Sequence, residues 1–394
     1  MKSTKYFTKK LLALLVALAM TAMLAACAGN SGGSTEATSE APVETQAAAA
    51  FEQTVTPNYL GTFIPTFSSR SGDSYTVGLY VKGNEVVGDY SYLSDFATAD
   101  PANGVTVSDI SIDASGTGFT AIAVQGTGDE KSTVNISNVD IKAYDDSDGT
   151  NACDFTGLGT VIVASGAGEN AHSVVNVDNV NIETKGFVRD GIIVDDYSDA
   201  IVTNSTITTY GANPLTDSYP TYMNTAKQAY MLSPPWIMSF LGGARSANVL
   251  GDYSSLSVID SDVTTGAWAV LSTDDCTAPV VNVINSSINI EPATSEYGMN
   301  GGAELFGYDY AYGSGYGTYS IGGANEYFYG AEFNGVTMAT VMTGTGETYY
   351  GPSYSGLTLK NGTGEDIYTY NGEAKNTVVN GVNGVMDHQG GTAV

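Results

Sequence analysis

The chain has few of the residues from which disulfide frameworks and metal sites are built. Its 394 residues include three cysteines and two histidines. After Cys27 only Cys153 and Cys276 remain, which is too few for a disulfide framework, and neither has the CxxC partner of a zinc or redox motif. His172 and His388 lie far apart and form no ligand cluster. We therefore expect no resident metal or other cofactor on histidine or cysteine, and Cys153 and Cys276 as buried apolar residues.

Basic residues are also scarce. The chain carries 14 Lys and Arg against 42 Asp and Glu, for a formal net charge of −28. A charge of this sign and size argues against nucleic acid and anionic lipid as partners, because both repel an acidic surface. It suits an exported protein, and solubility alone accounts for most of the acidic residues.

No apolar run is long enough to span a membrane. The longest, residues 11–24, is too short and follows four lysines within the first ten residues, as in a secretory signal peptide. The run ends in Leu24-Ala25-Ala26-Cys27, which resembles the lipobox of bacterial lipoproteins. The resemblance implies that residues 1–27 are a lipoprotein signal peptide with cleavage before Cys27 and lipidation of that cysteine. The alternative is an ordinary signal peptide with a chance cysteine.

Residues 28–50 consist mainly of Gly, Ser, Thr, Glu and Ala without an apolar period. Such a segment cannot bury a core and is typical of a flexible linker. We expect it to hold a folded domain away from the membrane, on the extracellular face of the cell. Membrane contact would then be made only through the lipid anchor.

Residues 51–394 contain an internal repeat. An eight-residue phrase has Asn or Asp at its fifth position and, nearly always, apolar residues at its first, third and eighth positions. It begins at Val105, Val134, Val175, Ala200, Leu256 and Val281. Two of the intervals are 25 residues, and the others equal one or two such units with insertions. A second, β-branched phrase precedes it in several units, at 120–124, 159–163, 191–194 and 266–270.

A unit of short strands cannot bury its apolar face alone, but stacked units bury a continuous core. The alternation before the Asn or Asp aims apolar residues inward, and Asn and Asp tolerate the left-handed conformation that a tight corner requires. These observations predict an all-β fold, a right-handed parallel β-helix with loop insertions. Over about residues 100–345 the texture resembles the pectate-lyase-like superfamily and adhesin-like β-helix proteins of bacterial surfaces. The alternative is an array of β-sandwiches.

We expect the β-helix domain, 51–394, to have an N-terminal cap at 51–102, coils at 103–345, and C-terminal coils with a cap at 346–394. Two insertions, at about 212–254 and 291–329, are candidates for binding because insertions into a solenoid gather on one face. Aromatic rings in them can cover the apolar faces of sugars, or can pack against the wall. The candidate ligand-binding residues are Lys227, Trp236, Arg245, Tyr308, Tyr310, Tyr312 and Tyr316, in segments that also contain Tyr319, Tyr327 and Tyr329.

Carboxylates near strand ends offer a second possibility. If the protein is an enzyme, the candidate catalytic residues are Arg189, Asp190, Asp195, Asp196, Asp274 and Asp275. Paired carboxylates serve glycoside hydrolysis, and Ca²⁺ with a basic side chain serves polysaccharide lyases. Asp190-Gly191 and Asp274-Asp275-Cys276 faintly resemble polygalacturonase motifs, but that family's Gly-His-Gly and Arg-x-Lys are absent. Turn-forming Asp residues are the simpler explanation of each pair.

A possible calcium loop begins at Asp145, but Thr156 stands where an EF-hand requires Glu, and an Asp-Gly turn is the simpler explanation. Without a complete motif, we expect a non-catalytic, adhesin-like surface protein that contacts an extracellular glycan or a surface protein. One alternative is an extracellular polysaccharide lyase or glycoside hydrolase acting on acidic polysaccharide. Another is a carbohydrate-capture module that feeds an uptake system.

Overall fold

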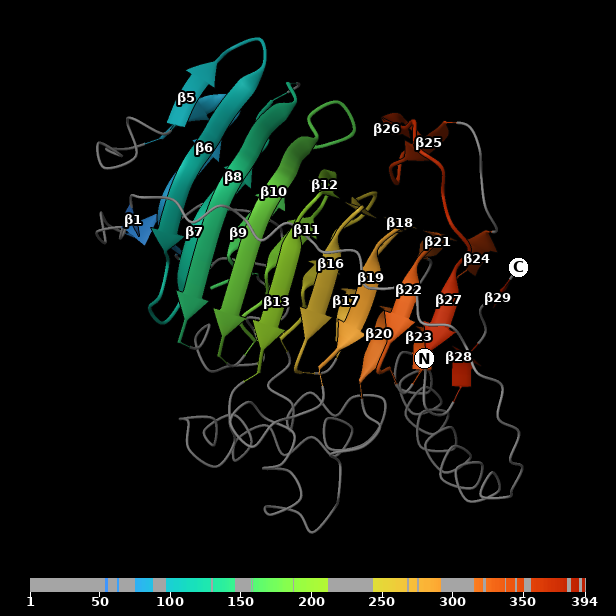
Figure 1. The fold of residues 1–394 in the computed structure, drawn as a ribbon. Helices are drawn as coiled ribbons and strands as arrows, with labels where there is room; N and C mark the ends of the chain where they lie inside the picture. Colours follow the sequence, from blue (N-terminus) through green and yellow to red (C-terminus); the bar gives the residue numbers. More distant parts are fainter. Residues whose placement is uncertain are drawn as a thin grey trace, which may run out of the picture. The chain divides into compact units, whose positions relative to one another are not determined.

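Stacked parallel strands build the described part of the protein, for which we use a computed structural model (Figure 1). The structure describes residues 54–55, 62–63, 75–87, 97–128, 130–145, 157, 159–186, 188–211, 244–267, 269–274, 276–291, 315–321, 324–336, 338–343, 346–350, 356–380, 384–389 and 392–393. These residues contain strands and turns and no helix, so none of them forms a helix that could cross a membrane.

The larger sheet, sheet A, has 16 strands. In its first units one long strand bends at a corner: β6 (Gly104–Asp113), β8 (Ser132–Tyr144) and β10 (Ser173–Lys185). In later units the same bend separates two strands. These pairs are β12 (Ser198–Thr203) with β13 (Thr206–Tyr210), β15 (Ser255–Ile259) with β16 (Asp262–Thr265), β18 (Val280–Ile284) with β19 (Ser287–Ile290), and β21 (Asn325–Tyr329) with β22 (Glu332–Asn334). Strands β24 (Gly346–Tyr350), β27 (Val378–Asn380) and β29 (Thr392–Ala393) end the sheet.

The second sheet, sheet B, has 11 strands and receives the chain between successive passes through sheet A. Its parallel members are β3 (Tyr75–Lys82), β7 (Phe119–Gln125), β9 (Ile162–Ser165), β11 (Ile192–Asp195), β14 (Ala247–Val249), β17 (Ala269–Thr273), β20 (Tyr316–Ile321), β23 (Met338–Thr343) and β28 (Gly384–Gln389). Antiparallel pairing is found near the N-terminal end, where β2 (Thr62–Phe63) and β4 (Glu85–Val86) pair with β3, and β5 (Ala97–Asp100) with β6. Strand β1 (Thr54–Val55) pairs with β6 in parallel.

The predicted repeat matches the strand register. The first position of the phrase stacks as one column, in which Val105 pairs with Val134, Val134 with Val175, and so on through Ala200, Leu256 and Val281. All six side chains are at most 1% exposed. Burying one such aliphatic side chain stabilises the fold by about 1.5–3 kcal/mol. The column and the buried residues beside it form one continuous core, as the repeat predicted.

The corner of each unit is made by the Asn or Asp at the fifth position of the phrase. This residue has φ between 46° and 58° in all six units. Asn and Asp occupy this left-handed region more easily than other non-glycine residues because their side chains bond locally. Asn138 donates to Asp109 at 3.0 Å and Asn179 donates to Asn138 at 2.8 Å, so part of the column is also a side-chain ladder. In the next unit Gly330, with φ of 74°, takes the corner position.

A hairpin leaves the stack and covers part of the outer face of sheet A. Strands β25 (Leu357–Lys360) and β26 (Asp366–Tyr370) pair only with each other among the described strands. Residues 357–377, here named the arm, place Leu359 and Ala374 against Ile201, Ile259 and Ile284, which point outward from sheet A. The sequence predicted no such hairpin.

The architecture is therefore all-β and solenoid-like, with parallel strands in curled sheets. All described residues belong to one compact unit.

Candidate functional site

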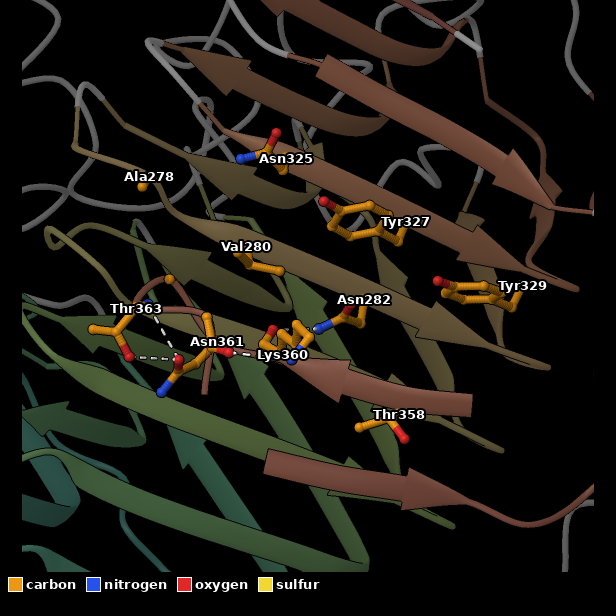
Figure 2. Close-up of a pocket in the computed structure, with 12 residues that line it drawn as sticks. Ala278, Val280, Asn282, Asn325, Tyr327, Tyr329, Thr358, Lys360, Asn361 and Thr363 are labelled. Atoms are coloured by element: carbon orange, nitrogen blue, oxygen red, sulfur yellow. Dashed lines mark hydrogen bonds between the residues drawn. The ribbon is translucent and has the colours of Figure 1, made fainter. Parts of the chain in front are cut away.

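The arm and the wall of sheet A together form a groove with a volume of about 440 Å³ (Figure 2). One side is the outer face of β18 and β21, and the other is β25 with the turn that follows it. The lining residues are Ala278, Val280, Asn282, Asn325, Tyr327, Tyr329, Thr358, Lys360, Asn361, Gly362, Thr363 and Gly364.

Strand alternation explains why polar and aromatic groups face this groove. Phe328 on β21 is fully buried and lies in the core, so Tyr327 and Tyr329 on either side of it face outward and are half-buried. Asn282 on β18 pairs with Tyr327 in the register and donates to Ser257 at 3.1 Å. Figure 2 shows the two Tyr rings along the same strand with their hydroxyl groups pointing the same way.

The arm supplies a hydroxyl and an ammonium group. Thr358 and Lys360 on β25 are both exposed. Lys360 Nζ forms an ion pair with Asp366 across the hairpin and donates to the Gly364 carbonyl at 3.2 Å. Among the described residues, no Asp or Glu lines the groove.

The turn of the arm is anchored in a buried polar network. Asn361 Nδ2 donates to Asp199 Oδ2 at 3.1 Å, while the Asn361 Oδ1 accepts from the backbone N–H of Thr363 and Glu365. Asp199 also contacts His172 Nδ1 at 2.9 Å and accepts from Ser255 Oγ at 2.6 Å. His172, Asp199, Ser255 and Asn361 are all at most 2% exposed.

Three further contacts hold the arm in place. Lys131 and Glu365 form an exposed ion pair at 2.6 Å. At the other end, Asn285 Nδ2 donates to the Tyr370 hydroxyl and to the Glu373 carbonyl, both at 2.9 Å. Near the turn, a Cβ on Gly362 would lie 2.4 Å from the Tyr253 carbonyl carbon, so only glycine allows this close approach. The arm is thus bound to several successive units of the stack.

The predicted tyrosines fall into three groups. Tyr327 and Tyr329, from the Tyr-rich segment, line the groove. Tyr316 and Tyr319 are 4% and 1% exposed, and their ring centroids are 6.5 Å apart. Residues that lie outside the described part of the chain, and whose predicted roles stay predictions, are Tyr308, Tyr310, Tyr312, Lys227, Trp236, Asp275 and Cys27.

Three of the predicted charged residues meet in one buried cluster. The Arg245 guanidinium lies between two carboxylates, with Nη1 3.8 Å from Asp190 Oδ2 and Nη2 3.8 Å from Asp274 Oδ2. Asp190 Oδ1 also accepts from the Arg245 backbone N–H at 2.7 Å, and Asn248 Nδ2 donates to Asp274 Oδ2 at 3.3 Å. Arg245 and Asp190 are at most 1% exposed and Asp274 is 6% exposed.

The other predicted catalytic residues bind backbone groups. Arg189 is fully buried, and its two terminal nitrogens donate to the carbonyls of Ala114, Gly116 and Phe119 at 2.7–3.2 Å. Asp195 Oδ1 accepts from the Asp196 backbone N–H at 3.1 Å, and Asp196 Oδ1 accepts from the Asp252 N–H at 2.9 Å. Contacts of this kind hold loops and turns, and the catalytic assignment of these residues stays a prediction.

No group of three or more His, Cys, Asp or Glu side chains within the described ranges is placed to hold a metal ion. The segment 145–149, where we considered a calcium loop, lies outside those ranges except for Asp145. Comparisons with protein-family models, with curated proteins and with solved structures find no match.

Sequence reasoning missed the contribution of the arm. Thr358, Lys360 and Asn361 reach the groove only because residues 357–377 fold back over the wall. The outward position of Tyr327 and Tyr329 could have been found, because their alternation with Phe328 follows the period of the strand.

Proposed function

We propose that this protein is a cell-surface lipoprotein whose right-handed parallel β-helix binds an extracellular glycan without catalysis. The observation that carries the proposal is the groove between the arm and β21. It combines two outward Tyr rings with amide, hydroxyl and ammonium groups in a volume typical of small-molecule sites. Aromatic rings next to polar groups suit sugars, which have apolar faces and polar edges.

The handedness and the superfamily of the fold are part of the proposal. Parallel strands of one sheet that are joined by a crossover form a right-handed connection in nearly all known cases. The coils alternate between sheets A and B with every strand of successive units parallel, which supports a β-helix related to the pectate-lyase-like and adhesin-like proteins.

The surface location rests on the sequence of residues 1–50. A lipidated Cys27 followed by a flexible linker would hold the domain on the outer side of the cell membrane. Labelling of the expressed protein with a radioactive fatty acid tests this step, since Cys27→Ser should abolish the label and Cys276→Ser should leave it unchanged.

A glycan array with the purified full-length protein tests the binding function. We expect binding to at least one glycan class, reduced at least tenfold by Tyr327→Ala and unchanged by Tyr144→Ala. Tyr144 is a matched control because it is half-buried on β8 and does not line the groove. Absence of binding to every glycan, with normal circular dichroism, would contradict the proposal.

A polysaccharide lyase or hydrolase is the second candidate, and one observation favours it. Asp190, Arg245 and Asp274 come from different units and meet in one cluster. Their burial and mutual charge pairing are also what a structural ion cluster requires. Incubation of the protein with acidic polysaccharides, with and without Ca²⁺, distinguishes a catalytic cluster from a structural one. Release of reducing ends or of an unsaturated uronate would establish an enzyme.

A further inference from the structure

The charge of the groove limits which glycan it can take. Among the described lining residues the only formal charge is that of Lys360, and the carboxylate of Asp366 pairs with it. The remaining polar side chains of the lining are amides and hydroxyls, namely those of Asn282, Asn325, Asn361, Tyr327, Tyr329, Thr358 and Thr363. Each of these groups can both donate and accept a hydrogen bond, as sugar hydroxyls do.

The wider field of the protein acts in the same direction. The chain has a formal net charge of −28, so an anionic polymer is repelled as it approaches. At physiological salt the field of exposed charges decays over about 8 Å. Charges close to the groove therefore determine whether a neutral or an anionic sugar binds. Among the described lining residues the only ammonium is that of Lys360, and because its charge is paired with Asp366 the lining offsets little of this repulsion.

The spacing of the two rings fits consecutive units of a chain. Tyr327 and Tyr329 are two residues apart on β21, so their Cα atoms lie about 7 Å apart. In Figure 2 the rings follow one another along the strand and face the same groove. A short extended oligosaccharide can therefore place successive rings over successive tyrosines, with Asn325 at one end of the row and the arm along one edge.

We infer that the groove between β21 and the arm binds a neutral oligosaccharide, with Tyr327 and Tyr329 as its stacking platform. The inference rests on the proposed glycan-binding function and narrows it to one ligand class. The arm supplies six of the twelve lining residues, so the site is complete only when the arm is docked on the wall. Lys360 is an ammonium group at the rim of this site, and because its charge is paired with Asp366 it does not select anionic sugars.

Isothermal titration with the full-length protein tests the inference. The probes are neutral hexasaccharides, namely gluco-, manno-, xylo- and galacto-oligosaccharides, and a galacturonic acid hexasaccharide of equal length, each at low and high salt. We expect a neutral probe to bind with an affinity that salt leaves unchanged. Tyr327→Ala should weaken it at least tenfold, which is about the loss of one ring contact. Lys360→Met should leave the salt dependence of this binding unchanged, because the charge of Lys360 is paired with Asp366.

One further variant in the groove and two control variants away from it make the result interpretable. Asn325 is exposed on β21, so Asn325→Ala should weaken binding without affecting the fold, in case Tyr327→Ala destabilises its strand. Tyr144→Ala and Lys82→Met should bind as the unmodified protein does, because neither residue lines the groove and Lys82 is exposed on β3.

The outcomes separate this inference from the proposed function. Preferred binding of the uronate probe, weakened by salt and by Lys360→Met, would overturn the neutral class and leave the glycan function standing. Neutral binding that Tyr327→Ala and Asn325→Ala both leave intact would place the site elsewhere and overturn the inference. Failure of all probes here and of the whole glycan array would overturn both.

Discussion

Replacement of Arg245 by methionine should strongly destabilise the protein. Arg245 is 1% exposed and its guanidinium lies 3.8 Å from the carboxylates of Asp190 and Asp274. At an effective dielectric constant of about 20, each pair at that distance contributes roughly 4 kcal/mol of gross attraction. Desolvation of the three charges offsets much of this gain, so the net contribution of the cluster is smaller than the sum.

The loss of the arginine is costly because it removes the guanidinium group that lies between two buried carboxylates. Breaking a buried pair in this way typically costs about 3–5 kcal/mol, a large part of the roughly 5–15 kcal/mol that stabilises an ordinary domain. Replacing all three charges together, as Arg245→Met with Asp190→Asn and Asp274→Asn, removes the buried charge. We expect this triple variant to recover most of the lost stability.

Urea unfolding followed by circular dichroism measures both variants. The matched control is Lys131→Met, which breaks the exposed ion pair with Glu365 and should cost less than about 1 kcal/mol. If Arg245→Met unfolds at the same urea concentration as the unmodified protein, or if the triple variant is no more stable than Arg245→Met, the cluster is not a buried ion network. A stabilising role would then no longer explain the cluster, and a catalytic role for Asp190, Arg245 and Asp274 would be favoured.

Two further predictions concern the corner of the stack and the arm above it. Gly330→Ala should lower the urea midpoint, because position 330 has φ of 74° and an alanine Cβ there would lie 2.6 Å from Asn285 Oδ1. Gly364 also has positive φ but has open space around it, so Gly364→Ala should lower the midpoint less. Partial burial raises the pKa of Asp260 above its usual range, with smaller opposing effects from Tyr370, Asn285 and Lys375. A carboxyl group with a raised folded-state pKa favours folding below its unfolded pKa and loses that contribution as pH rises through the folded value. The Asp260→Asn variant should therefore be more stable than the unmodified protein at pH 7. The urea midpoints of the two proteins should converge as the pH falls below about 4. A difference between the two midpoints that stays constant with pH would contradict this explanation.

The repeat made the stack predictable. The six copies of the phrase, aligned by residue type, pair in the same register in the structure, and the Asn or Asp at the fifth position has positive φ in all six. This succeeded because each unit contacts only its neighbours, so a local pattern with a fixed period contains most of the information about the fold.

Part of the charged cluster follows from the same alignment. Asp190 stands two residues before Ile192, and Arg245 stands two residues before Ala247, which pairs with Ile192 in the register. Aligned units therefore bring Asp190 and Arg245 together, although 55 residues separate them. Their burial was not predictable from type alone, because charged residues are rarely buried without partners.

The arm was not predictable because its contacts have no period. Asn361 binds Asp199 at a separation of 162 residues, and Lys131 pairs with Glu365 at a separation of 234. Neither contact repeats in other units, and the apolar residues that the arm covers, such as Ile201 and Ile259, occupy outward positions at which the phrase is usually polar. Those outward isoleucines were the one signal in the sequence that something covers this face.

The arm also limits how the protein can change its length in evolution. Most of a solenoid accepts duplication or deletion of a unit, because a new unit finds the same neighbours above and below it. Between Lys131 and Asn285 this freedom is lost, because the arm contacts Lys131, Asp199 and Asn285 and its span corresponds to a fixed number of units. We therefore expect natural variation in unit number to occur on the N-terminal side of Lys131, while the segment under the arm keeps its number of units.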